Sequence, residues 1–164
     1  MENFEIIFET ERIYFVKISK KLVKDYLIMV NNIEVQKYIS HKIKKYTLEQ
    51  ELEWIKNKLS TNSIIFSMIE KENNEFIGNI EIMKIINNIG EIGISITSKK
   101  QNKHFGQEAI KGFINYSFSN LNLKGLELNV YKSNLRGIHC YEKVGFKVIG
   151  EGKTSEDIHM KLIN

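Results

Sequence analysis

One short stretch in the second half of the chain has the residue types of a phosphate-binding turn. It reads Gln101-Asn102-Lys103-His104-Phe105-Gly106. It lies between an apolar strand pattern that ends near Ile96 and a helical pattern over about 105–119. The start of a helix offers unpaired backbone N–H groups and the positive end of the helix dipole, which together bind phosphate, and Lys103 adds charge. A surface turn without a ligand is the alternative interpretation.

A second stretch, residues 134–146, reads NLRGIHCYEKVGF and predicts a helix over about 134–144. Asn134 and Tyr141 are seven residues apart, which is about two helical turns, so their side chains share one face. The ordinary alternatives are that Asn134 only caps the helix and that Tyr141 is a core aromatic residue. Gly145 should end the helix in a left-handed conformation. Cys140 is interpreted as a small buried hydrophobe, because the sequence pattern supplies it with no base.

The first half of the chain must provide the frame that positions these stretches. Its patterns predict a strand over 4–18 interrupted near 10–12, a helix over about 20–32, a helical turn near 35–38 and a helix over about 48–59. Ser19 can cap the first helix. Thr47 and Gln50 form a capping-box pattern at the start of the last one. The expected buried stripe of that helix consists of Leu48, Leu52, Ile55 and Leu59.

From residue 63 the apolar period changes to that of strands. Three β-rich runs separated by Asn, Glu and Gly turns predict an antiparallel meander: SIIFSMIE, FIGNIEIMKI and GEIGISIT. A strand at about 126–131 lies between the two later helices, and the tail supplies strands at 147–150 and 157–163. We therefore expect an α/β (α+β) fold, with residues 1–164 forming a single domain. Its mixed, mostly antiparallel sheet should have about seven strands flanked by about four helices.

The two stretches together resemble the GNAT superfamily of N-acetyltransferases. Gln101 and Gly106 match its cofactor loop Q/R-x-x-G-x-G/A, whereas His104 stands where the family has glycine. Histidine can hold a left-handed backbone there. The pattern N-x-R-A-I-x-x-Y-E-K-x-G-F is matched in register by Asn134, Arg136, Ile138, Tyr141, Glu142, Lys143, Gly145 and Phe146. The early strand and helices, with TLEQELEWI and GNIEIMKI, resemble the branch that contains ribosomal-protein N-terminal and spermidine acetyltransferases.

This resemblance implies an enzyme that moves an acetyl group from acetyl-CoA to a primary amine by direct transfer in a ternary complex. Tyr141 is then the proton donor to the departing thiolate, and a phenol with a pKa of about 10 keeps its proton at neutral pH. The backbone of residues 94–96 should contact the cosubstrate and the thioester oxygen. The implied acetyl-CoA-binding residues are Ile94, Ser95, Ile96, Gln101, Asn102, Lys103, His104, Phe105, Gly106, Gln107, Asn129, Asn134, Arg136 and Tyr141.

A general base is also required, because an acceptor amine arrives largely as ammonium and must lose a proton before it attacks. Glu81 and Glu91, on neighbouring strands of the meander, are the candidate bases. The alternative is that each is an ordinary surface or cross-strand charge.

The acceptor is expected to be a polyamine, a protein N-terminal amine or another small amine. Lysines crowd the loop where the resemblance would place the acceptor, at Lys42, Lys44 and Lys45, whereas acidic residues nearby could bind a cation: Glu34, Glu49, Glu51 and Glu53. Two rival functions stay open. One is a non-catalytic GNAT-fold protein that binds CoA, suggested by His104. The other, ranked last, is a basic nucleic-acid-binding domain, suggested only by the net charge of +4.

Composition narrows the remaining classes. The apolar fraction of 42% and charged fraction of 27% are those of a globular chain, and no apolar run is long enough for a membrane span. The first residues lack the features of a secretory signal, so we expect a cytoplasmic protein. One cysteine and four histidines without paired spacing predict no disulfide within the chain and no metal. A homodimer is left open, and the lysine cluster Lys99, Lys100 and Lys103 is interpreted as a solvated face.

Overall fold

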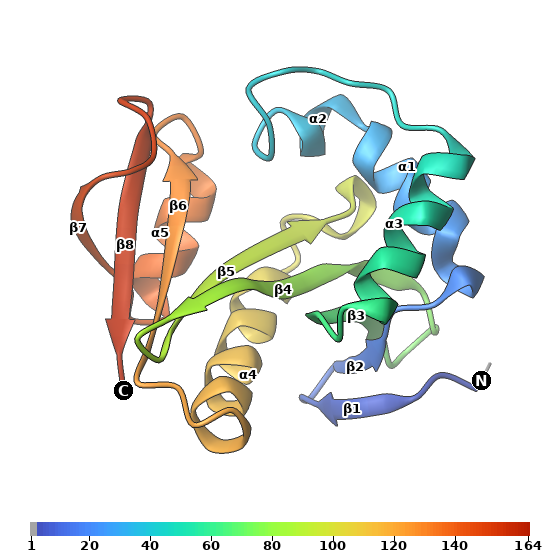
Figure 1. Cartoon of the computed structure of the whole chain (residues 1–164), viewed down its shortest axis with the longest axis horizontal. Helices are drawn as coiled ribbons and strands as arrows, with labels where there is room; N and C mark the ends of the chain where they lie inside the picture. Colours follow the sequence, from blue (N-terminus) through green and yellow to red (C-terminus); the bar gives the residue numbers. More distant parts are fainter. Residues whose placement is uncertain (1–2) are drawn as a thin grey trace. The chain divides into compact units, whose positions relative to one another are not determined.

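The computed structural model describes residues 3–164, and it has the mixed α/β fold expected from the sequence (Figure 1). The strands are β1 (Ile6–Glu9), β2 (Ile13–Lys17), β3 (Ile64–Glu70), β4 (Phe76–Ile86), β5 (Ile89–Ile96), β6 (Gly125–Tyr131), β7 (Lys147–Glu151) and β8 (Asp157–Ile163). The α-helices are α1 (Val23–Asn31), α2 (Ile33–Gln36), α3 (Leu48–Ser60), α4 (Phe105–Asn120) and α5 (Leu135–Lys143). Two 3₁₀-helices, η1 (Lys20–Leu22) and η2 (Ser98–Lys100), complete the elements.

The strands are hydrogen-bonded in the order β1-β2-β3-β4-β5-β6-β8-β7. The pairs β1–β2, β2–β3, β6–β8 and β7–β8 are antiparallel, whereas β5 and β6 run parallel. There are eight strands in the described residues rather than about seven, because the stretch over 4–18 forms two strands. A turn closed by the Thr10 N–H and the Ile13 carbonyl, 2.9 Å apart, separates them. The extra helix is the short α2, where only a helical turn was expected.

By its contacts the described chain divides into two compact units. The first unit extends to Glu81 and includes Ile94–Phe105, and the second consists of Ile82–Gly93 and the residues from Gly106 onwards. The β4–β5 hairpin and α4 each contribute residues to both units.

The core of the first unit joins its helices to its sheet, and α1 lies beside α3 (Figure 1). The cluster contains Val16, Ile18, Leu22, Tyr26, Met29, Val35, Ile55, Ile65, Ile69 and Phe76. Tyr26 also carries a buried polar chain, because its hydroxyl lies 2.6 Å from the Ser67 hydroxyl, which donates to Asn79 at 2.8 Å. Burial raises the pKa of Tyr26 to about 12. The polar chain satisfies groups that would otherwise be costly to bury.

The buried face of α3 differs from the predicted stripe. The capping box is confirmed, since the Thr47 hydroxyl accepts from the Gln50 N–H and the Gln50 side chain accepts from the Thr47 N–H. However, the fully buried residues of the helix are Glu51 and Ile55, whereas Leu48 and Leu59 are 48% and 38% exposed. The two leucines occupy the first and last turns, where apolar spacing alone could not determine which face would be covered.

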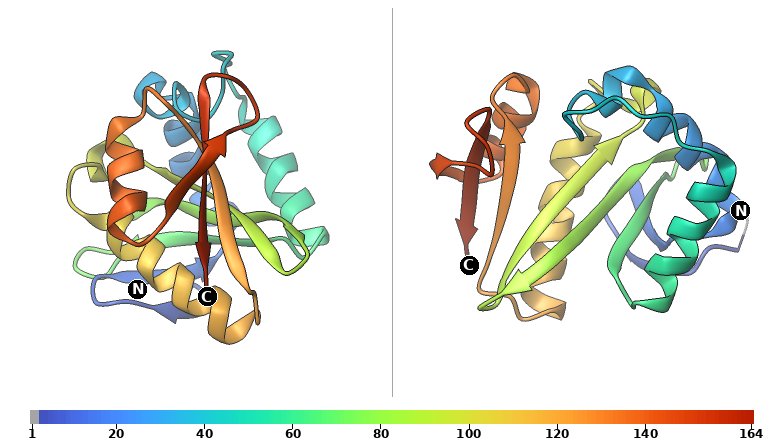
Figure 2. Two further views of the ribbon diagram at one scale, coloured as in Figure 1. Left: turned by 90° about the vertical axis from the view of Figure 1, so that its left-hand side faces the viewer. Right: turned by 45° about the horizontal axis from the view of Figure 1, so that its top comes forward.

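The second unit contains the C-terminal strands, which lie side by side (Figure 2). β6 pairs with β5 in parallel through Ile89 and Gly125, and it pairs with β8 in antiparallel fashion along its whole length. β7 is the outer strand, with an irregular register between Val148 and Gly150. The buried apolar residues of this unit include Ala109, Ile110, Phe113, Leu126, Leu128, Val130, Phe146 and Met160.

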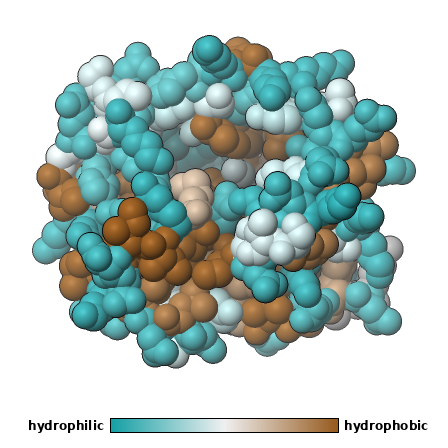
Figure 3. Space-filling model, in the orientation of Figure 1, coloured by the Kyte–Doolittle hydropathy of each residue, from teal (hydrophilic) through white to brown (hydrophobic). Residues whose placement is uncertain are grey.

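Hydrophilic residues are interspersed with apolar patches on the face drawn in Figure 3. Among residues 3–164 there is no helix with the length and apolar character that a membrane crossing requires.

A glycine sets how closely β4 approaches β5 beside the predicted acetyl-CoA-binding strand. A Cβ atom added at Gly78 would lie 1.9 Å from the Ser95 carbonyl oxygen and 2.9 Å from the Cα atom of Ile96. The Thr97 N–H donates to the Ile77 carbonyl at 2.9 Å, so the two strands stay paired at this point. Only a residue without a side chain fits there, because the obstructing atoms belong to the backbone.

Replacing Gly78 with alanine should lower the free energy of unfolding by about 2 kcal/mol or more, because the backbone of β5 must move. Met83→Ala, at a 49% exposed position of the same strand, should change it by less than about 0.5 kcal/mol. Urea denaturation followed by circular dichroism measures both values. A Gly78 variant as stable as the Met83 variant would contradict the close approach.

Candidate functional site

The predicted phosphate-binding turn lies between β5 and α4, as residues 97–104, which we call the 97–104 turn. Asn102 and His104 both have left-handed backbones, with φ of 59° and 63°. His104 therefore takes the left-handed conformation that glycine adopts at little cost, which histidine can also hold. The side chains of Asn102, Lys103 and His104 are exposed. α4 begins immediately afterwards at Phe105, so the first N–H groups of the helix, which have no carbonyl partner within the helix, lie at the end of the turn.

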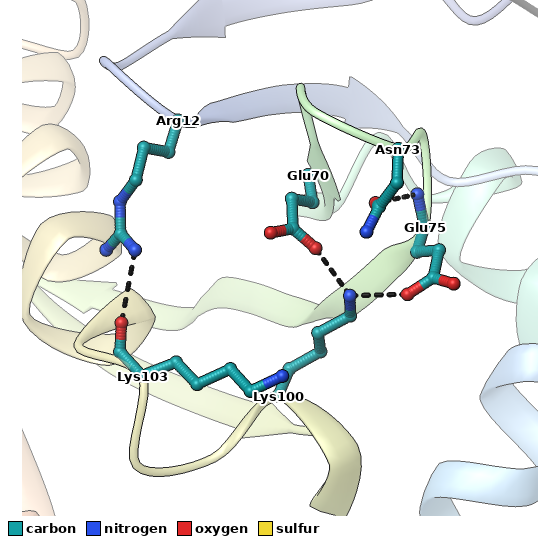
Figure 4. Close-up of polar contacts among 6 residues, drawn as sticks. All are labelled: Arg12, Glu70, Asn73, Glu75, Lys100 and Lys103. Atoms are coloured by element: carbon teal, nitrogen blue, oxygen red, sulfur yellow. Dashed lines mark hydrogen bonds and ion pairs between the residues drawn. The ribbon is translucent and has the colours of Figure 1, made fainter.

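Several side chains of the first unit fasten this turn (Figure 4). Lys100 is only 5% exposed, and its ammonium pairs with the carboxylates of Glu70 and Glu75. The Arg12 guanidinium donates to the Lys103 carbonyl at 3.1 Å and lies 4.4 Å from the centre of the Phe105 ring.

Gln101 adds a contact within the loop itself. Its side-chain amide donates to the Ile96 carbonyl at 2.9 Å, which bridges the end of β5 and the turn. Ile94, Ser95 and Ile96, the other predicted contacts on this strand, are half-buried, as are Gly106 and Gln107 in the first turn of α4.

Ion pairing keeps the groups around Lys100 charged. Burial disfavours the ammonium, but hydrogen bonds to Glu70 and Glu75 raise the pKa of Lys100 above its usual value. The hydrogen bond from Lys100 is also the main cause that lowers the pKa of Glu70, and the same holds for Glu75. Lys100 was expected on a solvated face with Lys99 and Lys103, and this expectation is wrong because the two carboxylates draw it into the protein.

The second predicted stretch forms α5 in the second unit. Asn134 is the residue before its first turn, and its side-chain oxygen accepts from the Gly137 N–H at 3.0 Å. A Cβ atom at residue 137 would lie 2.5 Å from the Asn134 amide nitrogen, so a larger residue there would require the Asn134 side chain to shift. Arg136 is exposed. Gly145 ends the helix with φ of 108°, as expected.

Tyr141 is half-buried on α5 and packs edge-on against Phe146, with 6.0 Å between the ring centres. Burial raises the pKa of Tyr141 above its ordinary value, and the neighbouring Cys140 raises it further. The phenol therefore keeps its proton throughout the neutral range. Burial likewise raises the pKa of the Cys140 thiol, so the thiolate needed for nucleophilic chemistry is disfavoured.

The two candidate bases have different surroundings. In the second unit, Glu91 is 2% exposed and its carboxylate contacts Lys153 at 2.7 Å, Lys84 at 3.2 Å and the Asn129 amide at 3.2 Å. Burial by itself raises the pKa of Glu91, but the hydrogen bonds from the two lysines bring it below its usual range. In the first unit, Glu81 is half-buried and pairs with Lys58 at 2.7 Å.

The predicted site residues are divided between the two units. The first unit holds residues 94–105 together with Glu81, and the second unit brings Asn129 to Glu91. Sequence reasoning did not single out Arg12, Glu70 or Glu75 as neighbours of the 97–104 turn. No local pattern marked them, because the acidic partners lie 30 and 25 residues from Lys100 in the sequence. Within residues 3–164, no group of three or more His, Cys, Asp or Glu side chains could hold a metal ion.

Similarity to known proteins identifies the class to which this fold and these motifs belong. Residues 12–147 match the acetyltransferase (GNAT) domain family, and the chain belongs to that family. It is similar to spermidine N(1)-acetyltransferase from Vibrio cholerae, with 32% identity over 115 residues. That match covers 68% of this chain and 65% of the relative, so less than two thirds of the relative's length is spanned.

Solved structures show the same fold. Spermidine N-acetyltransferase from Vibrio cholerae in complex with CoA and spermine has a TM-score of 0.83 and 21% identity, over 94% of this chain and 96% of that chain. A ribosomal-protein alanine acetyltransferase from Vibrio fischeri has a TM-score of 0.69 and 20% identity, over 96% of each chain. The expected resemblance to the branch with spermidine and ribosomal-protein acetyltransferases is confirmed.

The left-handed conformation of His104 can be tested by substitution. His104→Val should lower the free energy of unfolding by about 1–2 kcal/mol, because a β-branched residue is strained at positive φ. His104→Gly should change it by less than about 1 kcal/mol, since relief of strain is offset by a freer unfolded chain. Equilibrium denaturation in urea measures both. If the valine and glycine variants have the same free energy of unfolding, residue 104 does not hold this backbone conformation.

Proposed function

We propose that this chain is an acetyl-CoA-dependent N-acetyltransferase that acetylates a primary amine of a polyamine by direct transfer in a ternary complex. The observation that carries the proposal is Tyr141, which holds its proton on a helix in register with the family motif. We also propose that the two units together form one acetyltransferase domain, since the family match runs through both.

The 97–104 turn and the start of α4 fit the pyrophosphate of acetyl-CoA. Asn102, Lys103 and His104 expose their side chains, and the first N–H groups of α4, which have no carbonyl partner within the helix, follow them. In α5, Asn134 already uses its side-chain oxygen to cap the helix, so its amide N–H₂ is the group left for the cosubstrate. The remaining proposed contacts are Ile94, Ser95, Ile96, Gln101, Phe105, Gly106, Gln107, Asn129 and Arg136.

Acetyl-CoA supplies the acetyl group as a thioester. Tyr141 donates its proton to the sulfur that leaves, and its raised pKa keeps it protonated until then. Backbone N–H groups at the end of β5 would stabilise the negative charge that develops on the thioester oxygen. Glu81 and Glu91 remain the candidates for removing the proton of the acceptor amine.

Glu81 is the stronger of the two candidates. Glu91 is almost fully buried and its two oxygens already contact two lysines and an amide, which favours a structural role. Glu81 is half-buried and has one cationic partner, Lys58. A base must be reached by the acceptor or by a water molecule, and Glu81 meets that condition better.

A polyamine is the proposed acceptor because proteins similar to this chain in sequence or in fold include enzymes named for spermidine. Acidic side chains of the first unit could attract its ammonium groups. Glu51 is 5% exposed on α3, and burial raises its pKa, whereas Glu34 already pairs with Lys37 at 2.7 Å. A protein N-terminus is the second candidate, favoured by the fold shared with a ribosomal-protein acetyltransferase. The cytoplasmic location expected from the sequence stays a prediction.

Thiol release from acetyl-CoA tests the function directly, with spermidine, spermine, an alanine-terminated peptide and an aminoglycoside as separate acceptors. Release with the polyamines at least tenfold faster than with the peptide is expected. Faster release with the peptide would exchange the two candidate acceptors. If CoA binds but no acceptor releases thiol, the chain is the non-catalytic CoA-binding protein instead.

Tyr141→Phe should lower kcat by about a hundredfold, because the proton donor is removed while the ring that packs on Phe146 is kept. The dissociation constant for CoA, measured by calorimetry, should change by less than about twofold. Cys140→Ala is the control, and its kcat should stay close to that of the unaltered protein. Unchanged turnover in Tyr141→Phe would remove the role assigned to this residue.

Glu81→Gln should lower kcat by about a hundredfold if Glu81 takes the proton of the acceptor. Glu91→Gln should leave kcat within about fivefold and should mainly lower stability at neutral pH. The sign follows from the lowered pKa of Glu91, which contributes stability above its unfolded-state pKa and loses it as the pH falls through the folded-state value. A larger loss of kcat in Glu91→Gln would assign the base to Glu91.

A further inference from the structure

We propose that Lys100 is a positioning residue: its ion pairs with Glu70 and Glu75, together with the contacts of Arg12, hold the 97–104 turn in the conformation that binds the phosphates of CoA. This inference rests on the proposed function, because it concerns the same cosubstrate. It adds Arg12, Glu70 and Glu75, which lie outside the turn and outside both family motifs, and Lys100, which lies in the turn but before the motif at residues 101–106.

The turn has a backbone conformation that is costly for residues with side chains. Family members have glycine where this chain has His104, and glycine adopts left-handed backbone at little cost. Here both left-handed residues, Asn102 and His104, carry side chains. Each left-handed residue of this kind costs free energy relative to the ordinary regions of the backbone map. Contacts from outside the turn must offset that cost if the free protein is to populate this conformation.

Glu70, Glu75 and Arg12 contact the turn from outside. Lys100 precedes the two left-handed residues, and its ammonium reaches Glu70 at the end of β3 and Glu75 just before β4 (Figure 4). Arg12 fixes the other side, because it donates to the carbonyl of Lys103 and lies over the ring of Phe105. The backbone between these two attachments is therefore held at both ends.

The pairing also places two negative charges beside the proposed phosphate site. Two carboxylates close to a phosphate site would repel the anion, so their charge must be compensated. Lys100 lies between Glu70 and Glu75 and is only 5% exposed. Its pair with Glu70, whose side chain is 13% exposed, is therefore poorly screened by solvent, whereas the side chain of Glu75 is 56% exposed. The ammonium of Lys100 contacts these carboxylates, and it acts on the ligand through the backbone of the turn. The exposed Lys103 stays available at the surface of the same turn.

Lys100→Met removes the ammonium and keeps most of the side-chain volume. If only about one molecule in ten then holds the binding conformation, the dissociation constant for CoA should rise about tenfold. The KM for acetyl-CoA should rise in parallel, with kcat within about twofold. Hydrogen exchange of the amides of residues 101–104 in the protein without CoA should become faster, which reports on the turn without any activity measurement.

Lys71→Met is the matched control. Lys71 follows Glu70 in the sequence. Its ammonium pairs with Glu9 at 3.0 Å and lies 4.8 Å from the centre of the Tyr14 ring, so substitution removes an ion pair on another side chain. Its variant should bind CoA within about twofold of the unaltered protein. Glu75→Gln is a milder second variant, because Lys100 keeps its ion pair with Glu70, and it should weaken CoA binding about threefold. It provides the test if Lys100→Met does not fold.

Calorimetry with CoA separates the outcomes. If the unaltered protein does not bind CoA, the proposed function and this inference both fail. If it binds CoA, but folded Lys100→Met or Glu75→Gln binds as tightly and exchanges the turn amides as slowly, only the positioning role is overturned. A loss of equal size in Lys71→Met would also overturn it, since the effect would then be one of general charge.

Discussion

A buried ammonium must be paired, and the pairing of Lys100 determines the surroundings of the 97–104 turn. Taking this charge out of water is costly unless opposite charges and hydrogen bonds compensate it. Glu70 and Glu75 provide them from the ends of two neighbouring strands, so the connection between β3 and β4 becomes the support for the connection between β5 and α4. Removing one partner would leave a buried charge, which makes the cluster more demanding than a surface ion pair.

The two proposed halves of the acetyl-CoA site use backbone chemistry in different ways. The 97–104 turn has exposed side chains and a left-handed backbone without glycine, and it leads into the first N–H groups of α4. The start of α5 is already capped by Asn134, whose side-chain oxygen accepts from the Gly137 N–H. A residue can thus be a helix cap and a ligand contact at once, because an amide side chain has both acceptor and donor groups.

The carboxylates show how surroundings separate residues that look alike in sequence. Glu81 and Glu91 both lie on strands of the meander, yet only Glu91 is enclosed and held by two lysines. Glu51 shows the reverse situation, since it is buried on α3 and its pKa is raised by desolvation without an opposing charge among the causes. A buried carboxylate with a raised pKa is the kind of group often found at functional sites, and it lies on an element where acceptor contacts were expected.

Much of this protein could be predicted from its sequence because the signals were local. Helix α3 starts at a capping box, α5 ends at a left-handed glycine, and the change of apolar period at residue 63 marks the strands; each depends on residues a few positions apart. The tertiary structure alone decided that Lys100 is buried, that Glu51 rather than Leu48 faces the interior, and that Lys153 reaches Glu91. Those outcomes depend on partners far away in the chain, and neither spacing nor propensity records which distant groups will meet when the core closes.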